Sequence, residues 1–406
     1  MNGKLKGETL AVIAGVKADT AHNAVMPPLY LSSNFSFPEP GAAPEFDYTR
    51  SGNPTRTLLS QALADLEGGV GGVITSSGMA AVDLALTLAG PGDLVVAPKD
   101  CYGGTYRLLE ARRKKGAFDV VFVDQSDPGE LAAVFARNPR LVLVETPTNP
   151  LMRIVDIAPL CRRAKEAGAL VAVDNTFLSP ARQQPIALGA DLVIHSTTKY
   201  INGHSDVVGG AVIAATAELH EHLKWWANCT GVTGAPFDAY MTLRGLKTLY
   251  ARLSQQEKSA CVIASFLDAA PAIARVYFPG LKAHPGHEIA ARQQSGFGAM
   301  LSFELAGGLD AVKAFTSRLS LFTLAESLGG VESLIAHPVS MTHAAMDPEA
   351  RKEAGIGEGL LRLSVGIECV DDLIADLQRG LAALRIDPET DSESGRDDVK
   401  LQALCG

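Results

Sequence analysis

The chain lacks any run of apolar residues long enough to span a membrane, and it has no excess of basic residues. Its 406 residues include 36 lysine and arginine residues and 45 aspartate and glutamate residues, which gives a formal net charge of −9 at pH 7. This acidic balance argues against nucleic acids and anionic membranes as partners. The first 15 residues contain lysines but only a short apolar segment, which Gly15 interrupts. We therefore expect mature protein there rather than a signal peptide.

Cysteine is scarce, and no two cysteines have the CxxC spacing. The six cysteines are scattered over the chain, at positions 101, 161, 229, 261, 369 and 405. Disulfide frameworks are typical of shorter secreted chains with more closely grouped cysteines. The sequence therefore predicts reduced thiols and a cytoplasmic protein.

Two motifs that would indicate other cofactors are missing. The segment HPGHE at 284–288 has two histidines and a glutamate, but not the HExxH spacing of zinc-dependent hydrolases. The segment GGVGG at 68–72 does not match GxGxxG, and no ribose-binding acidic residue follows at the expected distance. The sequence predicts neither a metal site nor a nicotinamide site.

Short apolar segments alternate with helical patterns over most of the chain. Such alternation predicts βαβ units and hence an α/β fold with a doubly wound, mainly parallel sheet. Further strands and a C-terminal amphipathic helix at about 371–384 predict a smaller α+β domain. The expected strands of the large sheet lie at 72–75, 94–97, 120–123, 141–145, 170–174, 192–195 and 210–214, and those of the small domain lie near 275–278, 298–305 and 361–366.

We expect the chain to divide into four parts. Residues 61–250 form a large domain, and residues 251–387 form a small C-terminal domain. Residues 1–60 are rich in proline, serine, asparagine and aromatic residues and are too polar to form a core, so they are expected to be an arm that clasps a partner. Residues 388–406 are charged and poor in aromatic residues, which is typical of a disordered tail.

The most informative segment runs from residue 174 to residue 210. One expected strand ends at Asp174, and the next is followed by Ser196, Thr198 and Lys199. The carboxyl ends of parallel strands meet at one edge of the sheet, where open α/β proteins bind their ligands. This set suits pyridoxal 5′-phosphate: Lys199 would form the Schiff base, Asp174 would pair with the pyridinium nitrogen, and the two hydroxyl groups would hold the phosphate. The alternative is a surface lysine that follows a strand.

A second phosphate-binding feature follows the expected strand at 72–75. Ser77, Gly78 and Met79 lead directly into the helical run AAVDLALTLA. Free backbone N–H groups at the start of a helix attract anions. Many strand-to-helix turns contain serine and glycine, so this turn indicates a phosphate site only in combination with the expected lysine site.

Several segments together resemble the Cys/Met-metabolism family of pyridoxal-phosphate enzymes, which have the aminotransferase fold type I. They extend from about Val25 to about Leu384. Besides the segment at 174–210, they are YTRSGNPTR (48–56), DCYGGTYRL (100–108), ETPTNP (145–150), GHEIAARQQSGFGAMLSFEL (286–305), LSLFTLAESLGGVESL (319–334) and LLRLSVGIE (360–368).

The resemblance implies a set of residues that bind the cofactor. Lys199, Tyr102 and Asp174 are the implied catalytic residues, with the ring of Tyr102 stacked on the pyridine ring. Asn149 is implied to contact the cofactor ring and the substrate, although a turn residue before proline is an adequate alternative. Apart from Tyr48 and Arg50, which are described below, the implied set is Ser77, Gly78, Met79, Tyr102, Asn149, Asp174, Thr176, Ser196, Thr198 and Lys199.

The resemblance also implies an oligomer with shared sites. In the family, the residues that match Tyr48 and Arg50 cross to a neighbouring subunit and bind the phosphate of its cofactor. A guanidinium group suits phosphate geometry, whereas the alternative is a solvated loop arginine. We therefore expect a homotetramer built from dimers.

A third implied group of residues binds the substrates. In the family, the residue that matches Arg362 pairs with the α-carboxylate. Alternation along the strand places Arg362 opposite its apolar face, where a solvent-facing arginine is the alternative. An acidic residue at position 326 is typical of members that act at Cγ, whereas cystathionine β-lyases carry a different residue there. The implied substrate residues are Arg362, Ser327, Asn149, Glu326, Asp47 and Arg107.

Within the family, the segments are most similar to members that replace the γ-substituent of an O-acyl-L-homoserine. The implied reaction joins O-succinyl-L-homoserine, or the O-acetyl ester, to L-cysteine and gives L-cystathionine, as in methionine biosynthesis by transsulfuration. The alternative is γ-elimination from cystathionine or methionine. Gly104 disfavours methionine as the substrate, because cysteine is expected at this position in enzymes that cleave it. A non-catalytic pyridoxal-binding regulator would need an attached DNA-binding segment or a lost lysine, and neither is seen.

Overall fold

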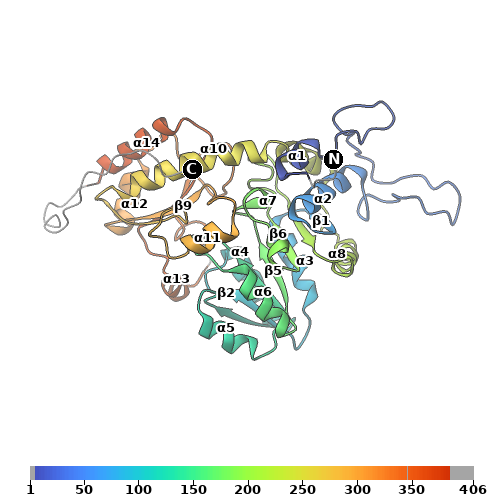
Figure 1. Cartoon of the computed structure of the whole chain (residues 1–406), viewed down its shortest axis with the longest axis horizontal. Helices are drawn as coiled ribbons and strands as arrows, with labels where there is room; N and C mark the ends of the chain where they lie inside the picture. The colour runs from blue at the N-terminus through green and yellow to red at the C-terminus, as the bar shows by residue number, and fades with distance from the viewer. Residues whose placement is uncertain (1–4, 345, 385–406) are drawn as a thin grey trace.

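A computed structural model of the chain describes residues 5–344 and 346–384 (Figure 1). The predicted tail at 388–406 and the last residues of the predicted small domain lie outside the described part. The smaller sheet lies above and to the left of the larger sheet in Figure 1, and the long helix α10 (Leu249–Asp268) runs along the top of the molecule. The predicted boundary near residue 250 falls at the start of this helix, and the division into domains stays a prediction.

The larger sheet has seven strands in the order β1-β7-β6-β5-β4-β2-β3. All pairs among β2 to β6 are parallel, whereas β7 runs antiparallel to both of its neighbours, β1 and β6. The prediction of a mainly parallel α/β sheet is therefore confirmed. The strands are β1 (Gly71–Thr75), β2 (Leu94–Pro98), β3 (Asp119–Val123), β4 (Leu141–Glu145), β5 (Leu170–Asp174), β6 (Leu192–His195) and β7 (Gly210–Ala214).

The smaller sheet has five strands in the order β10-β11-β12-β9-β8. Three of them lie where the sequence predicts strands, and the two short strands β10 and β11 are additional. The strands are β8 (Ile273–Tyr277), β9 (Met300–Leu305), β10 (Thr323–Leu324), β11 (Leu334–Ala336) and β12 (Leu360–Ser364).

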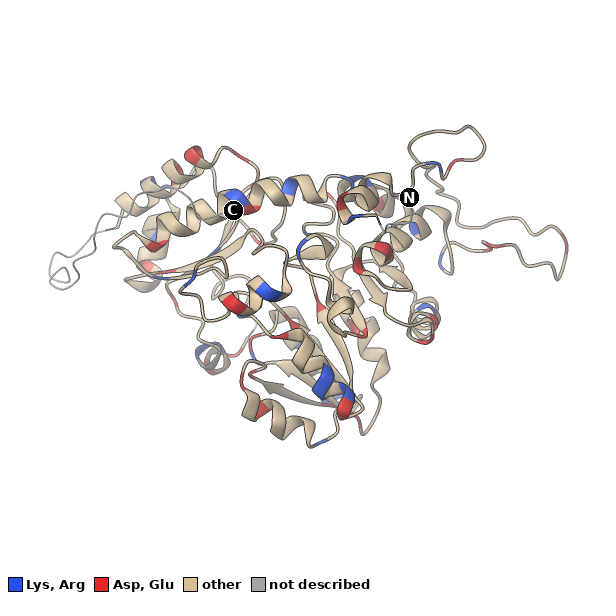
Figure 2. Cartoon of the chain, viewed as in Figure 1, with Lys and Arg blue, Asp and Glu red and all other residues tan. Residues whose placement is uncertain are grey.

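Helices cover both faces of the larger sheet because its buried strands are apolar on both sides. Residues of α3, α4 and α8 pack on one face, and residues of α5 and α6 pack on the other. Acidic and basic residues are interspersed on the outer helices (Figure 2). The remaining helices are α1 (Gly7–Ile13), α2 (Pro54–Glu67), α7 (Ser179–Arg182), α9 (Pro236–Leu246), α11 (His287–Gln293), α12 (Gly308–Thr316), α13 (Pro348–Ala354) and α14 (Val370–Ala382); those named above are α3 (Gly78–Ala85), α4 (Gly103–Lys114), α5 (Pro128–Phe135), α6 (Ile157–Glu166) and α8 (Ala217–Thr230), with short 3₁₀ turns at Leu86–Leu88 and Pro185–Leu188.

Residues 5–60 contain more regular structure at both ends than the sequence suggests. Helix α1 buries Ala11, and helix α2 already begins at Pro54, capped by the buried Asn53. The side chain of Asn53 accepts hydrogen bonds from the N–H groups of Thr55 and Arg56. Between these helices the chain makes long loops that extend away from the rest of the molecule (Figure 1).

Candidate active site

Lys199 lies in the turn after β6, at the carboxyl edge of the parallel strands. Its Nζ donates a 2.8 Å hydrogen bond to Oγ of Ser327, which precedes the smaller sheet's strand β11. Burial lowers the pKa of Lys199 to about 8, and the positive charge of Arg362 adds to this, whereas Glu326 opposes it. A lysine with a pKa of about 8 is uncharged in roughly a tenth of molecules at pH 7, far more than an ordinary lysine, and the uncharged amine is the form that acts as a nucleophile or a base.

Asp174 ends β5, one strand away from the lysine turn. Its Oδ1 accepts a 3.0 Å hydrogen bond from the N–H of Thr176, whose own Oγ1 accepts one from the N–H of Ser196. Burial raises the pKa of Asp174, while the hydrogen bonds from Thr176 act in the opposite direction. A half-buried carboxyl group of this kind suits a cationic partner, such as a protonated ring nitrogen.

The turn between β1 and α3 forms the predicted anion cradle. Ser77 caps the helix by accepting a 3.1 Å hydrogen bond from the N–H of Ala80. Gly78 and Met79 occupy the first turn of the helix, where backbone N–H groups have no acceptor within the helix. A Cβ atom at Gly78 would lie 2.7 Å from Cβ of Ser196, so glycine is needed for the lysine turn to approach this helix. The close approach brings a hydroxyl group to the positive end of the helix.

Thr198 contributes less directly to this cradle. Its Oγ1 accepts a 3.0 Å hydrogen bond from the N–H of Gly209 and donates to the carbonyl oxygen of the same residue at 3.2 Å. The hydroxyl group therefore already has two partners in the backbone. An anion at the helix end would compete with the carbonyl oxygen for the hydroxyl proton.

Tyr102 stands at the start of α4, with 40% of its surface exposed. A Cβ atom at Gly104 would lie 2.6 Å from Cε1 of the Tyr102 ring and 3.0 Å from the sulfur atom of Met79. Any larger residue at position 104 would displace the ring. With glycine at position 104, the ring keeps its place at the cavity, where it can stack on a flat ligand.

Arg362 is buried, although it lies on the strand face opposite the apolar side chains. Its Nη1 donates to Oδ1 of Asn149 at 2.8 Å, and its Nη2 donates to the carbonyl oxygen of Ser327 at 2.9 Å. Its Nε is buried without a hydrogen-bond partner. Burial lowers the pKa of Arg362 to about 10. A buried guanidinium group with a free donor suits a carboxylate ligand.

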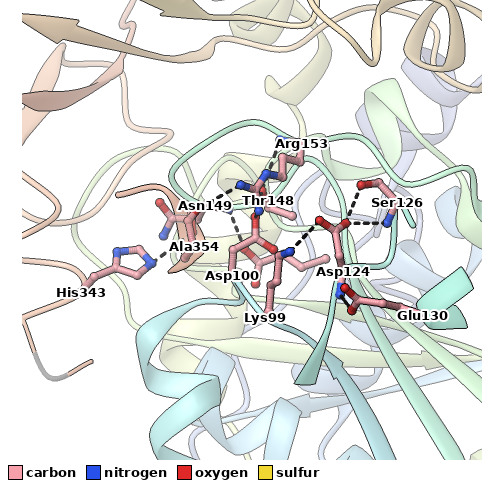
Figure 3. Close-up of polar contacts among 11 residues, drawn as sticks. Lys99, Asp100, Asp124, Ser126, Glu130, Thr148, Asn149, Arg153, His343 and Ala354 are labelled. Carbon is pink, nitrogen blue, oxygen red and sulfur yellow. Dashed lines mark hydrogen bonds and ion pairs between the residues drawn. The ribbon is translucent and has the colours of Figure 1, made fainter. Parts of the chain in front are cut away.

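The loop that carries Asn149 is fixed by a network of side chains (Figure 3). Asp100 accepts a 2.9 Å hydrogen bond from Oγ1 of Thr148 and forms a 3.1 Å ion pair with Arg153. Arg153 also donates to the carbonyl oxygen of Ala354 at 2.9 Å, at the end of α13. His343 contacts the carbonyl oxygen of Asn149 at 3.1 Å. The network ties this loop of the larger sheet to the segment that follows β11.

These side chains surround one cavity of about 290 Å³, a size that suits a small ligand. It brings together most of the predicted residues: Ser77, Gly78, Met79, Tyr102, Asn149, Asp174, Thr176, Ser196, Thr198, Lys199, Glu326, Ser327 and Arg362. Sequence reasoning missed several further lining residues, namely Val82, Thr105, Glu145, Pro147, Phe177, Val208, Leu328 and Thr342.

Four predicted residues do not line this cavity within one chain: Asp47, Tyr48, Arg50 and Arg107. All four are exposed. Nη1 of Arg50 donates to Oδ1 and to the carbonyl oxygen of Asn228, each at 2.6 Å, and the guanidinium group lies 5.5 Å from the ring centroid of Tyr48. Their assignment to a shared site between subunits stays a prediction.

A nucleophilic lysine, a carboxyl group one strand away, an aromatic ring and an anion cradle define a site for pyridoxal phosphate. The family model for Cys/Met metabolism PLP-dependent enzymes matches residues 8–382. The chain belongs to this family of pyridoxal-phosphate-dependent enzymes, as the sequence motifs indicate.

Relatives in this family differ in the reaction for which they are named. The chain is 55% identical to cystathionine γ-synthase of Escherichia coli, with 93% of this chain and 98% of the relative covered. It is 46% identical to a cystathionine β-lyase of Lactococcus lactis, with 92% and 98% covered, and 45% identical to cystathionine γ-lyase of Bacillus subtilis, with 93% and 99% covered.

The fold has equally similar solved relatives. A crystal structure of cystathionine γ-synthase from Xanthomonas oryzae pv. oryzae, in complex with aminoacrylate and cysteine, matches with a TM-score of 0.93 and 60% identity over 94% of this chain and 99% of the other. The predicted fold type is therefore confirmed. Among the described residues, no helix has the length and apolar character needed to cross a membrane.

Proposed function

We propose that this chain catalyses γ-replacement, the reaction of cystathionine γ-synthases. The Cγ–O bond of an O-acyl-L-homoserine breaks, and the acyl group leaves as a carboxylate with the bonding electrons. The sulfur of L-cysteine forms the new Cγ–S bond and loses its proton, so that L-cystathionine and, from the succinyl ester, succinate are formed. We place this reaction in methionine biosynthesis by transsulfuration and in the cytoplasm, the compartment that the scattered cysteines predict.

One observation carries the choice of reaction. Glu326 lines the same cavity as Lys199 and Arg362, so the site offers a carboxylate as well as a guanidinium group. Arg362 can hold the α-carboxylate of the first amino acid, and Glu326 can hold the ammonium group of a second one. A site that can hold two amino acids supports replacement, and the same carboxylate also fits a γ-lyase, because its substrate cystathionine carries a second ammonium group. The 55% identity with the Escherichia coli synthase supports the same choice.

The residues of the cavity fit the cofactor. Gly78, Met79 and Ser196 would hold the phosphate, Asp174 would hold the ring nitrogen, and Tyr102 would cover the ring. The bound cofactor withdraws electrons from the Cα and Cβ positions of the substrate, which makes their protons removable.

The proton transfers fall to Lys199. Its pKa of about 8 allows Nζ to accept a proton and to return one near neutral pH. Oγ of Ser327 accepts a hydrogen bond from Nζ and so fixes the direction in which the amine points. Arg362 fixes the opposite end of the substrate through its carboxylate. The Cα and Cβ protons would therefore be held between Lys199 and Arg362, within reach of the amine.

The nearest alternative is a γ-lyase that cleaves cystathionine. The relatives named as lyases share the same family, so the distinction depends on the second amino acid site. Product analysis separates the two reactions. With O-succinylhomoserine and cysteine we expect cystathionine, and without cysteine we expect slow formation of 2-oxobutyrate, ammonia and succinate. Efficient cleavage of cystathionine, with little synthesis in the competing assay, would show a γ-lyase instead.

A variant sharpens this experiment. Glu326→Ala removes the proposed partner of the cysteine ammonium group, so the cysteine concentration at half-maximal synthesis should rise roughly ten- to a hundredfold. Cofactor content should stay near that of the parent enzyme. An unchanged cysteine requirement would contradict the role of Glu326.

We further propose a homotetramer of dimers in which Tyr48 and Arg50 reach the partner's cavity. The support is their exposure, together with the family motif that contains them. In that arrangement Asp47 and Arg107 would border the entrance to the cavity.

A further inference from the structure

Glu145 ends β4 in register with Asp174 at the end of β5. Residues paired in register on neighbouring parallel strands point to the same face, so the two carboxyl groups stand side by side at the cavity. Glu145 lines the cavity as Asp174 does, yet only 8% of its surface is exposed. Burying Glu145 beside the carboxyl group that is expected to bind the cofactor is electrostatically costly, so Glu145 is expected to have a function there.

Both oxygen atoms of Glu145 are used by the walls of the cavity. Oε2 accepts a 2.9 Å hydrogen bond from the N–H of Tyr102, and Oε1 accepts a 2.8 Å hydrogen bond from the N–H of Asn149. The first N–H belongs to the turn after β2, and the second belongs to the turn after β4. One carboxyl group therefore fastens two separate loops to the same point of the sheet.

The fastened residues are those that face the ligand. Tyr102 offers its ring, and Asn149 accepts a 2.8 Å hydrogen bond from Nη1 of Arg362 through its Oδ1. A continuous chain of contacts thus runs from Glu145 through Asn149 to the guanidinium group. We propose that Glu145 is a positioning residue, which fixes the ring of Tyr102 and the amide of Asn149 over the cofactor. Each of its oxygen atoms accepts a backbone hydrogen bond from one of the two loops, so the carboxyl group is oriented toward the loops.

The electrostatics link this role to the cofactor. Burial raises the pKa of Glu145 well above its usual range, and the negative charge of Asp174 raises it further, whereas the two N–H hydrogen bonds lower it. A cation held at Asp174 would relieve the repulsion between the two carboxyl groups. Cofactor binding would then favour the ionised form of Glu145, which accepts the stronger, charge-assisted hydrogen bonds.

The test compares Glu145→Gln with a matched control on the next residue. The glutamine keeps the shape but replaces one acceptor oxygen by an NH₂ group, which cannot accept from a backbone N–H. We expect the dissociation constant of pyridoxal phosphate from the apoenzyme to rise roughly tenfold. The visible circular-dichroism band, scaled to bound cofactor, should lose intensity because the ring is held less firmly. Exchange of the amide hydrogens at Tyr102 and Asn149 should become faster.

The control is Thr146→Val. Thr146 is also buried, and its Oγ1 accepts a 3.0 Å hydrogen bond from the N–H of Val155, but it does not line the cavity. This variant also leaves one buried N–H without its acceptor. It should lower the melting temperature while the dichroism band and the dissociation constant stay unchanged.

Two results would overturn the proposal. One is a Glu145→Gln enzyme that loses melting temperature as the control does, yet keeps the dissociation constant and the dichroism band. If that variant does not fold, Glu145→Asp, which is too short to reach both N–H groups, is judged by the same readouts. The other is that Glu145→Gln and Glu145→Asp are both insoluble while Thr146→Val is soluble, which would show that Glu145 is needed only for folding. All readouts are taken without substrate, so they stand apart from the proposed reaction.

Discussion

Nζ of Lys199 and Oγ of Ser327 are joined by a 2.8 Å hydrogen bond, although the two residues are 128 positions apart and belong to segments associated with different sheets. Ser327 holds a left-handed backbone conformation, with φ of 82°. Residues other than glycine adopt this conformation at a cost, and such strain is found at functional sites when the surroundings enforce it. The contact is the point at which the reactive amine is oriented.

Covalent attachment of the cofactor should depend on Lys199 alone. Borohydride should fix pyridoxal phosphate to this residue in the parent enzyme. Lys199→Ala should still bind the cofactor through the phosphate cradle, but borohydride should fix none, and turnover should fall by roughly 10²- to 10⁴-fold because the base is lost. Mass spectrometry of peptides after reduction checks the site. Lys224→Ala, a change at an exposed lysine, should behave as the parent does.

The rate of covalent attachment should rise with pH up to about 8. Only the uncharged amine attacks, so below a pKa of about 8 the rate should fall about tenfold per pH unit. The carboxylate of Glu326 raises the pKa of Lys199, so Glu326→Gln should move the midpoint of this profile to lower pH. Stopped-flow absorbance of apoenzyme reconstitution measures it. Glu358→Gln, at an exposed position, is the control, and a midpoint that moves to higher pH would contradict the assignment.

Arg362→Lys should raise KM for O-succinylhomoserine more than it lowers kcat. The guanidinium group of Arg362 contacts Asn149 and Ser327 and still has Nε available for a carboxylate. Lysine keeps the positive charge but cannot make all of these contacts. The loss of charge-assisted hydrogen bonds should raise KM roughly ten- to a hundredfold. Arg182→Lys, which alters a half-buried ion pair with Glu257 away from the cavity, should change stability but not KM. Equal KM values for both variants would contradict the proposal that Arg362 binds the substrate carboxylate.

Two inactive variants should complement one another if sites are shared between subunits. Arg50→Ala damages the site of the partner, whereas Lys199→Ala damages its own site. Random reassembly of an equal mixture should leave about one quarter of the sites intact, because half of the dimers are mixed and each has one unaltered site. Activity after joint refolding measures this. Lys199→Ala mixed with Asp174→Ala is the control, and it should recover nothing; absence of recovery in both mixtures would argue for sites built from single chains.

The carboxyl ends of the central strands could be predicted from the sequence to the residue. Strands β4, β5, β6 and β7 begin and end where the apolar runs do, because strands that are buried on both faces are apolar throughout. Strands β10 and β11, two and three residues long, give no such run. These strands form because β11 pairs with both β10 and β12 in the folded chain. The sequence alone does not show which segments become neighbours.

The role of Glu145 could not be predicted in the same way. The sequence marks it as the end of a strand, but its contact with the N–H of Tyr102 joins residues 43 positions apart. His343, which contacts the carbonyl oxygen of Asn149, is a similar case. Arg362 is intermediate: strand alternation predicts the face on which it lies, but not that this face is buried against the site instead of solvent. Proximity that arises only in the folded chain leaves no local pattern.

The bond between Lys199 and Ser327 also has a consequence for the lifetime of the protein in a cell. A cofactor that is covalently attached at Lys199 occupies a cavity lined by segments of both sheets, so binding stabilises the folded chain against opening between them. A chain made while pyridoxal supply is low would open more often and be removed sooner by proteases. The abundance of the protein would thus follow the vitamin that it uses.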